Sequence, residues 1–258
     1  MSLSPPIVLS IAATDPSGGA GLTADILTIA SFGCHPLLAV TAVTVQDSTR
    51  VDEVIAMDDD AVADQLRMIL EDMPVAAFKL GLLGSSENIA AIADVVADYP
   101  DIPLVLDPVL ASGGNNDELT TEEMIEAMRE LLLPQTTIIT PNSLEARRLA
   151  ENSADEMLSL QTCAARLIRY GVEHVLITGG HEHTAQVVNS LYSEGRGLVR
   201  QEAWERLPGS YHGSGCTLAA AIAAGLAQGL DVEAAVQEAQ AYTWETLAAG
   251  FRRSEERR

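Results

Sequence analysis

The hydrophobic and polar positions of the chain alternate between short apolar runs and longer segments in which apolar residues recur at helical spacing. Residues 7–13 read Ile-Val-Leu-Ser-Ile-Ala-Ala, and a helical pattern over 22–32 follows a glycine-rich loop. Apolar runs of this kind are typical of parallel strands that helices cover on both faces. The pattern therefore predicts an α/β fold in which a mainly parallel central sheet lies between helical layers.

The same alternation continues to the end of the chain. It predicts further strands over 36–45, 76–80, 104–106, 137–140 and 174–178, and further helices over 59–71, 86–97 and 121–132, with two short helices before the last of these strands. It also predicts a hairpin over 186–192 and 198–204, and two final helices that begin at Cys216 and Val232. Because no internal repeat or linker interrupts the pattern, we expect a single domain over 1–258, with a frayed tail over 252–258.

The segment 211–217, Tyr-His-Gly-Ser-Gly-Cys-Thr, leads directly into an alanine-rich series. Gly213 and Gly215 lack a Cβ atom, which lets the backbone turn tightly and bring its N–H groups near a negatively charged ligand. The alanine-rich series favours a helix, and the N-terminus of a helix attracts phosphate. The segment therefore predicts an anion cradle that contains Ser214 and the thiol of Cys216. An ordinary helix start with a buried cysteine is the alternative interpretation.

A second glycine cluster, Thr-Asp-Pro-Ser-Gly-Gly-Ala-Gly over 14–21, follows the first predicted strand. It is not a Walker A loop, because no Gly-Lys-Ser/Thr sequence closes it. The order of strand, tight loop and helix predicts a polar pocket at the carboxyl end of the strand. Asp15 and Asp25 are candidates to accept hydrogen bonds from a small ligand there.

Seven motifs follow one another along the chain: Asp15-Pro-Ser-Gly-Gly-Ala-Gly21 with Ala24-Asp25, Thr41-Ala-Val-Thr-Val-Gln46, Lys79-Leu-Gly-Leu82, Val105-Leu-Asp-Pro-Val109, Thr140-Pro-Asn-Ser-Leu-Glu-Ala146, Gly179-Gly-His181 and His212-Gly-Ser-Gly-Cys-Thr217. In this order they resemble the motifs of hydroxymethylpyrimidine/phosphomethylpyrimidine kinases, which are thiamine-biosynthetic members of the ribokinase-like superfamily. The resemblance runs from about Ile7 to Ala249. It implies a ribokinase-like three-layer α/β/α fold and ATP-dependent phosphorylation of the hydroxymethyl group of 4-amino-5-hydroxymethyl-2-methylpyrimidine, and also of its monophosphate.

The resemblance also implies roles for residues near the ends of the predicted strands. It places the pyrimidine near Gly19, Ala20, Gly21, Asp25, Gln46, Leu82 and Val109. It places the nucleotide near Asn142, Thr178, Gly179, Gly180 and His212, and Mg²⁺ near Asp107 and Glu145. In this arrangement Gly213, Ser214 and Gly215 hold the transferring phosphoryl group beside Cys216.

Several of these residues also fit roles that involve no ligand. Asn is a frequent helix cap, which is the simpler role for Asn142. Asp107 precedes a proline and His212 precedes a glycine, so each also suits a turn. Gln46 ends a buried strand, where its amide needs a partner. The donor and acceptor edge of an aminopyrimidine would satisfy that amide, and a surface turn at 47–48 is the alternative.

The chemistry of Cys216 has two interpretations. Its ordinary pKa of ~8.5 leaves a thiol mostly protonated at neutral pH, but a helix N-terminus lowers the pKa and favours the thiolate. The thiolate would accept the proton of the hydroxymethyl group as its oxygen attacks the γ-phosphate. Alternatively, the N–H groups of the loop stabilise the phosphoryl group and the thiol only orients the hydroxyl.

The chain has 258 residues, of which 15 are basic and 37 acidic, with a formal net charge of −22. This excess argues against nucleic acid or an anionic membrane as a partner. Because the same negative charge repels the phosphates of ATP, we expect local N–H donors and a divalent cation at the nucleotide site. Three cysteines at scattered spacings, Cys34, Cys163 and Cys216, favour a reducing compartment. No apolar stretch approaches the ~20 residues of a membrane span. We therefore expect a cytoplasmic enzyme, and we expect a homodimer.

Two departures from the family pattern leave alternatives open. Many relatives have Lys directly before the Gly-Gly-His motif, where this chain has Thr178, and they usually carry a Gly-, Pro- and His-bearing tail that this chain lacks. One alternative is a pyridoxine or pyridoxal kinase, because those substrates also carry a hydroxymethyl group on a heteroaromatic ring. The other alternative is a catalytically weak pyrimidine-binding regulatory protein.

Overall fold

The computed structural model describes residues 4–111, 119–150, 158–209 and 211–250. The strands are β1 (Ile7–Thr14), β2 (His35–Gln46), β3 (Val51–Ala56), β4 (Val75–Leu80), β5 (Leu104–Leu106), β6 (Ile138–Ile139), β7 (His174–Ile177), β8 (Gln186–Ser193) and β9 (Gly197–Glu205). The helices are α1 (Gly21–Ser31), α2 (Asp59–Asp72), α3 (Ser86–Ala97), α4 (Glu122–Ala127), α5 (Ser143–Ala150), α6 (Leu160–Arg169), α7 (Ser214–Ala227) and α8 (Val232–Ala249).

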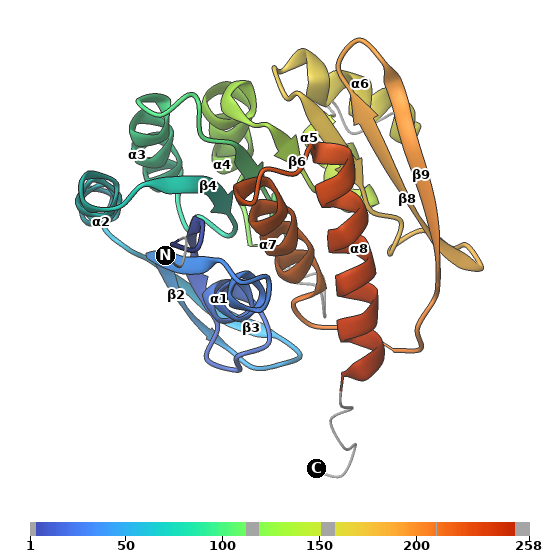
Figure 1. Ribbon diagram of the computed structural model, residues 1–258, viewed down its shortest axis with the longest axis horizontal. Helices are drawn as coiled ribbons and strands as arrows, with labels where there is room; N and C mark the ends of the chain where they lie inside the picture. Colours follow the sequence, from blue (N-terminus) through green and yellow to red (C-terminus); the bar gives the residue numbers. More distant parts are fainter. Residues whose placement is uncertain (1–3, 112–118, 151–157, 210, 251–258) are drawn as a thin grey trace.

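The strands form one sheet in the order β3-β2-β1-β4-β5-β6-β7-β8-β9 (Figure 1). The six strands from β2 to β7 in this order pair in parallel. β3 pairs antiparallel with β2 at one edge, and β8 and β9 add antiparallel pairs at the other. The predicted α/β fold with a mainly parallel sheet is therefore confirmed.

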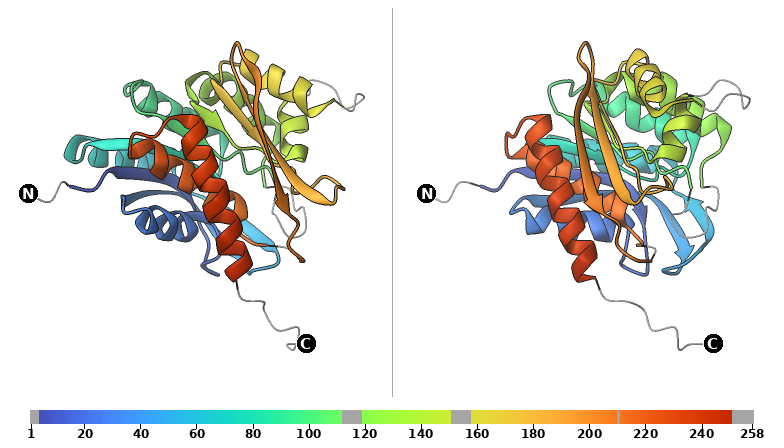
Figure 2. Two further views of the ribbon diagram at one scale, coloured as in Figure 1. Left: turned by 45° about the vertical axis from the view of Figure 1, so that its right-hand side comes forward. Right: turned by 90° about the vertical axis from the view of Figure 1, so that its right-hand side faces the viewer.

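Helices cover both faces of the sheet, as Figures 1 and 2 show. Leu9 of β1 belongs to the core formed with α2 to α6, whereas its neighbour Val8 belongs to the core formed with α1, α7 and α8. Successive side chains of a strand point to opposite faces, so a continuous apolar run contributes side chains to both cores. α7 is almost entirely apolar because it lies between the sheet and α8.

The helices begin in two different ways. In α2, α3, α4, α6 and α8 the side chain of the preceding Asp, Ser or Thr accepts a hydrogen bond from an N–H group of the first turn. The residues that precede α1 and α7, Ala20 and Gly213, make no such side-chain bond. These two helices therefore begin at glycine loops, and the residue before each helix does not cap the N–H groups of the first turn with its side chain.

The structure differs from the predicted elements at three places. β3 was not predicted. It pairs antiparallel with β2 after a turn in which the side chain of Asp47 accepts hydrogen bonds from the N–H groups of Thr49 and Arg50. The helix predicted over 121–132 is α-helical only to Ala127 and continues as a π-helical turn. α7 begins two residues before Cys216. The tail expected over 252–258 lies outside the described residues, and none of the described helices has the length and apolar character to cross a membrane.

Candidate active site

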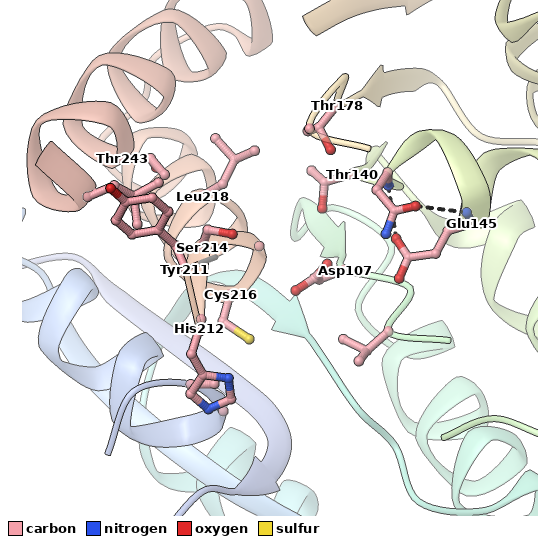
Figure 3. Close-up of a pocket in the computed structure, with 18 of the residues that line it drawn as sticks. Asp107, Thr140, Glu145, Thr178, Tyr211, His212, Ser214, Cys216, Leu218 and Thr243 are labelled. Carbon is pink, nitrogen blue, oxygen red and sulfur yellow. Dashed lines mark hydrogen bonds between the residues drawn. The ribbon is translucent and has the colours of Figure 1, made fainter. Parts of the chain in front are cut away.

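A cavity of about 420 Å³ opens where the parallel strands end. The carboxyl ends of parallel strands meet at one edge of a sheet, where ligands bind in open α/β folds. The predicted site residues that line this cavity are Ala20, Gly21, Gln46, Leu82, Asp107, Val109, Asn142, Glu145, Thr178, Gly180, His212, Gly213, Ser214, Gly215 and Cys216. Figure 3 shows Ser214 and Cys216 on one side of the cavity, with Asp107, Glu145 and Thr178 across from them.

The two glycine loops predicted from the sequence pack against each other. Gly213 has a left-handed backbone with φ of 81°, and a Cβ atom there would collide with the carbonyl oxygen of Gly19. Gly21 has φ of 54°, and a Cβ atom there would lie 2.5 Å from the carbonyl oxygen of Ala13. Glycine is required at both positions by backbone conformation and by close approach. The two loops thus form one continuous wall, although Gly19 itself is not among the residues that line the cavity.

Asp15 joins these loops through its side chain. Asp15 as a residue is only 3% exposed. Its carboxylate accepts hydrogen bonds from the backbone N–H groups of Ser17 and Ala20 and from Nε2 of His212, each at 2.8 Å. Burial acts to raise the pKa of Asp15, but hydrogen bonds from Ser17, His212 and Gln46 outweigh it and hold the pKa below its ordinary value. The carboxylate therefore stays ionised and accepts a hydrogen bond from each of these neighbours.

His212 was predicted to contact the nucleotide. Its ring lies against Asp15, and a Cβ atom at Gly19 would come within 2.8 Å of the ring carbon Cδ2. The ring therefore connects the second loop to the first, which supports the turn-shaping interpretation, and the predicted contact of His212 with the nucleotide stays a prediction.

Cys216 lies half-buried at the start of α7, where it lines the cavity. The pKa of the thiol was expected to fall. Burial instead raises the pKa of Cys216 to about 12; the buried cation of Lys79 acts to lower it, but the nearby carboxylates of Asp107 and Asp25 act with burial. Desolvation and nearby negative charge thus act against the helix N-terminus and favour the thiol over the thiolate.

Asp25 was predicted to contact the substrate, but its side chain is fully buried beneath the cavity. Its Oδ2 atom accepts hydrogen bonds from Nζ of Lys79 at 2.8 Å and from the hydroxyl of Ser10 at 2.6 Å. Burial acts against the charge of Lys79, but Asp25, Cys216 and Asp107 raise the pKa of Lys79 above its ordinary value. Lys79, rather than Asp25, lines the cavity, as a permanent cation at its floor.

Asn142 and Glu145 cap the start of α5 in a reciprocal arrangement. Oδ1 of Asn142 accepts the N–H groups of Leu144 at 2.9 Å and Glu145 at 3.0 Å, while the N–H of Asn142 donates to Oε2 of Glu145 at 2.9 Å. Oε1 of Glu145 accepts the N–H of Leu110 at 3.3 Å. The helix-cap interpretation of Asn142 is therefore confirmed, and the Glu145 carboxylate is held in place by two backbone donors.

Asp107 and Glu145 carry raised pKa values at this end of the cavity. Burial raises the pKa of Glu145 to about 8, and the negative charge of Asp107 adds to the effect. Burial also raises the pKa of Asp107 to about 6, with a contribution from Asp25. Two buried carboxyl groups that repel each other fit a hard divalent cation, which would relieve that repulsion. Among the described residues, no cluster of three or more His, Cys, Asp or Glu side chains is placed to hold a metal ion.

Thr178 and Gly180 line the cavity after β7, but Gly179 between them does not. Its N–H donates to Oδ1 of Asn189 at 3.0 Å, and a Cβ atom at Gly179 would collide with the backbone of Val188. Gly179 thus lies behind the cavity lining, and its place beside the nucleotide stays a prediction. Glycine is needed there because β8 approaches closely.

Arg206, which lies just after β9, is a cavity residue that the sequence analysis missed. Its guanidinium donates to the carbonyl oxygens of Gly180 at 2.7 Å, Glu182 at 2.8 Å and Thr184 at 3.1 Å. It therefore holds the loop after β7 in place. No motif marks Arg206, and its position depends on the pairing of β8 with β9. Trp204 and Trp244 also line the cavity and stack with ring centroids 6.3 Å apart.

The family model of phosphomethylpyrimidine kinase matches residues 15–257 of the chain. A hydroxymethylpyrimidine/phosphomethylpyrimidine kinase of Streptomyces coelicolor is 37% identical over 253 residues, which cover 96% of this chain and 91% of that protein. The corresponding kinase of Mycobacterium tuberculosis is 39% identical over 251 residues, with 96% and 90% covered. The chain therefore belongs to the phosphomethylpyrimidine kinase family, as the order of its motifs predicted.

Solved structures of ribokinase-like kinases share the fold. An ADP complex of Bacillus subtilis pyridoxal kinase aligns with a TM-score of 0.86 at 29% identity, covering 98% of this chain and 95% of that one. A phosphomethylpyrimidine kinase of Clostridium difficile aligns with a TM-score of 0.80 at 29% identity, covering 94% and 99%. The predicted ribokinase-like fold is thus confirmed, and the fold alone does not separate pyrimidine from pyridoxal kinases.

Proposed function

We propose that the chain transfers the γ-phosphoryl group of ATP to the hydroxymethyl oxygen of 4-amino-5-hydroxymethyl-2-methylpyrimidine, and that it also phosphorylates the monophosphate, in thiamine biosynthesis. Family membership over residues 15–257 supports this reaction. The structural observation that carries the proposal is the packing of Gly213 against Gly19. It sets the start of α7, an anion cradle, directly beside the loop that forms the polar end of the cavity.

Phosphoryl transfer depends on positioning and on charge stabilisation more than on covalent chemistry. The first N–H groups of α7 have no partner within the helix, so they would stabilise the negative charge of the transferring phosphoryl group beside Gly215 and Cys216. A thiol with a pKa of about 12 stays protonated at neutral pH. We therefore assign Cys216 the role of orienting the substrate hydroxyl, and the backbone the role of stabilising charge.

The nucleotide would lie on the far side of the cradle, against Asn142, Thr178 and Gly180. Asp107 and Glu145 fit Mg²⁺, and they would hold it between their carboxylates and the phosphates of ATP. When bound, Mg²⁺ neutralises phosphate charge that the protein, at a formal net charge of −22, would otherwise repel.

A pyridoxal kinase is the second candidate, since the Bacillus subtilis enzyme of that name aligns over 98% of the chain. A coupled ADP-release assay with four acceptors, the hydroxymethylpyrimidine, its monophosphate, pyridoxal and ribose, separates the candidates. The proposal expects the highest kcat/KM for the first two. Higher kcat/KM for pyridoxal would overturn it, and pyrimidine binding without ADP release would favour a regulatory protein.

We further propose a single-domain cytoplasmic homodimer, since ATP is a cytoplasmic substrate. Val43, Val45 and Ile55 on β2 and β3 support the dimer: Val43 pairs with Ile55, and all three apolar side chains are between 44% and 48% exposed. An apolar surface on a highly acidic protein is a suitable contact for a second copy of the chain, because two chains of like charge can associate there without bringing their charged side chains together. Light scattering coupled to size-exclusion chromatography should give twice the chain mass of 27.3 kDa. A monomer at micromolar concentration would contradict the proposal.

A further inference from the structure

Asn189 of β8 and Gln240 of α8 form a pair of buried amides behind the loop that follows β7. Oδ1 of Asn189 accepts the backbone N–H of Gly179 at 3.0 Å, and Nδ2 of Asn189 donates to Oε1 of Gln240 at 2.8 Å. We propose that the two amides are positioning residues for the nucleotide: they hold the backbone of Gly179, and with it Thr178 and Gly180, where the loop faces ATP. This inference rests on the proposed function, which places the nucleotide against Thr178 and Gly180.

The first step is the burial of the groups involved. Asn189 is 9% exposed and Gln240 is 4% exposed, and a buried amide is costly unless its donor and acceptor have partners. Gly179 is buried as well, because β8 approaches so closely that a Cβ atom there would collide with Val188. Water therefore does not reach the N–H of Gly179, and its position depends on the amide of Asn189.

The second step is the direction of the hydrogen bonds. The backbone N–H of Gly179 only donates, so Asn189 must face it with its carbonyl oxygen. At the other end, Nε2 of Gln240 donates to the carboxylate of Glu202 at 2.9 Å, and the indole N–H of Trp204 donates to Oε1 of Gln240 at 3.2 Å. A carboxylate only accepts and an indole only donates. Each amide therefore has a single orientation, and the hydrogen bonds run in one direction from Gly179 to Glu202.

The third step is the support on the other side of the loop. The guanidinium of Arg206 donates to the carbonyl oxygens of Gly180 at 2.7 Å and Gly179 at 3.4 Å. Asn189 holds the N–H side of Gly179, and Arg206 holds the carbonyl side. Removing the amides would leave the loop supported from one side only, so it should shift relative to the rest of the cavity.

The amides lie far from the end of the cavity predicted for the pyrimidine. Gln46 ends β2, and β1, β4, β5 and β6 lie between β2 and β7 in the sheet. Adjacent strands are about 4.8 Å apart, so roughly 24 Å separates β2 from β7. A shift of the loop after β7 should thus weaken nucleotide binding and leave pyrimidine binding nearly unchanged.

The test is Gln240→Met, which keeps the length of the side chain and removes its amide. The Kd for ADP, measured by isothermal titration calorimetry, and the KM for ATP should rise about tenfold, as expected for one lost hydrogen bond. The KM for the hydroxymethylpyrimidine should stay within about twofold of the parent, whereas partial misfolding would lower kcat and change neither KM. Gln201→Met is the matched control: it removes the bond from Gln201 to Ser190, which also links β9 to β8, and both KM values should stay parental.

Asn189→Leu tests the same inference from the other amide, should the first variant fold poorly. It removes the acceptor of the Gly179 N–H and should raise the Kd for ADP at least as much. Adding Gln240→Met to Asn189→Leu should raise it no further, because Gln240 acts through Asn189. Additive losses would mean that Gln240 contacts the nucleotide itself.

Three results overturn the inference: parental ADP affinity in either single variant, equal rises of the two KM values, or additive losses in the double variant. ADP binding needs no phosphoryl transfer, so these affinities decide the inference separately from the reaction. A parent protein that binds ADP and does not phosphorylate the pyrimidine would contradict the proposed function alone.

Discussion

Gly213 packs so closely on Gly19 that a single added methyl group at position 213 would collide with the carbonyl oxygen of Gly19. This contact joins the start of α7 to the loop between β1 and α1. The hydrogen bond from His212 to Asp15, at 2.8 Å, supports the same junction through side chains. The start of α7, which we propose as the phosphate cradle, and the polar end of the cavity are therefore positioned together.

Gly213→Ala should lose most of its kcat and unfold at lower temperature. A left-handed residue other than glycine costs about 1–2 kcal/mol, and the collision with Gly19 would also displace the cradle. Gly195→Ala is the matched control, because Gly195 has φ of 71° and open space around it. Thermal unfolding and ADP release measure both effects. Equal losses of kcat in the two variants would show that strain alone, rather than the contact with Gly19, accounts for the result.

Cys216→Ser and Cys216→Ala separate the two roles of the thiol. If the thiol orients the substrate hydroxyl, Ser should keep much of the activity, because its hydroxyl also forms hydrogen bonds, whereas Ala should lose more. If a thiolate were the base, both variants should lose ~10²-fold or more in kcat, since a serine hydroxyl does not ionise near neutral pH. Steady-state kinetics with saturating ATP decide between them, and equal large losses would contradict the orienting role.

Lys79→Met should destabilise the protein by about 3–5 kcal/mol, because it leaves the carboxylate of Asp25 buried without its cation. Lys79→Met combined with Asp25→Asn removes both charges and should recover part of that loss. Urea denaturation of the parent, the single variant and the double variant measures this. A double variant that is less stable than Lys79→Met alone would contradict the assignment of the two residues as a buried ion pair.

Glu145→Gln should change the dependence of stability on pH in a defined direction. The pKa of Glu145 is raised from 4.5 to about 8 in the folded protein, so the folded state binds this proton more tightly than the unfolded state. Glu145 therefore makes the free energy of unfolding fall as pH rises from about 4.5 to about 8. In the variant, the free energy of unfolding should decrease less over the same pH range. Denaturation at pH 5, 6, 7 and 8 measures the difference, and parallel curves for variant and parent would contradict it. If Glu145 also holds Mg²⁺, the variant should need more Mg²⁺ for half-maximal rate.

Sequence patterns located the fold and the cavity because both depend on local features. Apolar runs marked the parallel strands, and polar residues at their ends, such as Asp107 and Asn142, had to meet at one edge of the sheet. β3 was missed because four of its six residues are exposed, so its apolar pattern is weak. Its pairing with β2 also depends on the Asp47 turn, a feature of side-chain hydrogen bonding.

The direction of individual side chains was not predictable in the same way. Asp25 belongs to a family motif, yet its side chain lies under the cavity. Its buried partner there is Lys79 of β4, which is far from Asp25 in the sequence. The thiol of Cys216 lies at a helix N-terminus, yet burial raises its pKa, and carboxylates from other elements add to the effect. Arg206 carries no motif and reaches the cavity only through the pairing of β8 with β9. Each of these depends on contacts between residues far apart in the sequence.

The most direct test of the central claim is the identity of the phosphorylated product. The chain should be incubated with ATP, Mg²⁺ and either 4-amino-5-hydroxymethyl-2-methylpyrimidine or pyridoxal, and the ring compounds should be analysed by mass spectrometry. The pyrimidine should gain one phosphoryl group and then a second, with matching release of ADP, while pyridoxal should be phosphorylated far more slowly. An unchanged pyrimidine beside readily phosphorylated pyridoxal would contradict it.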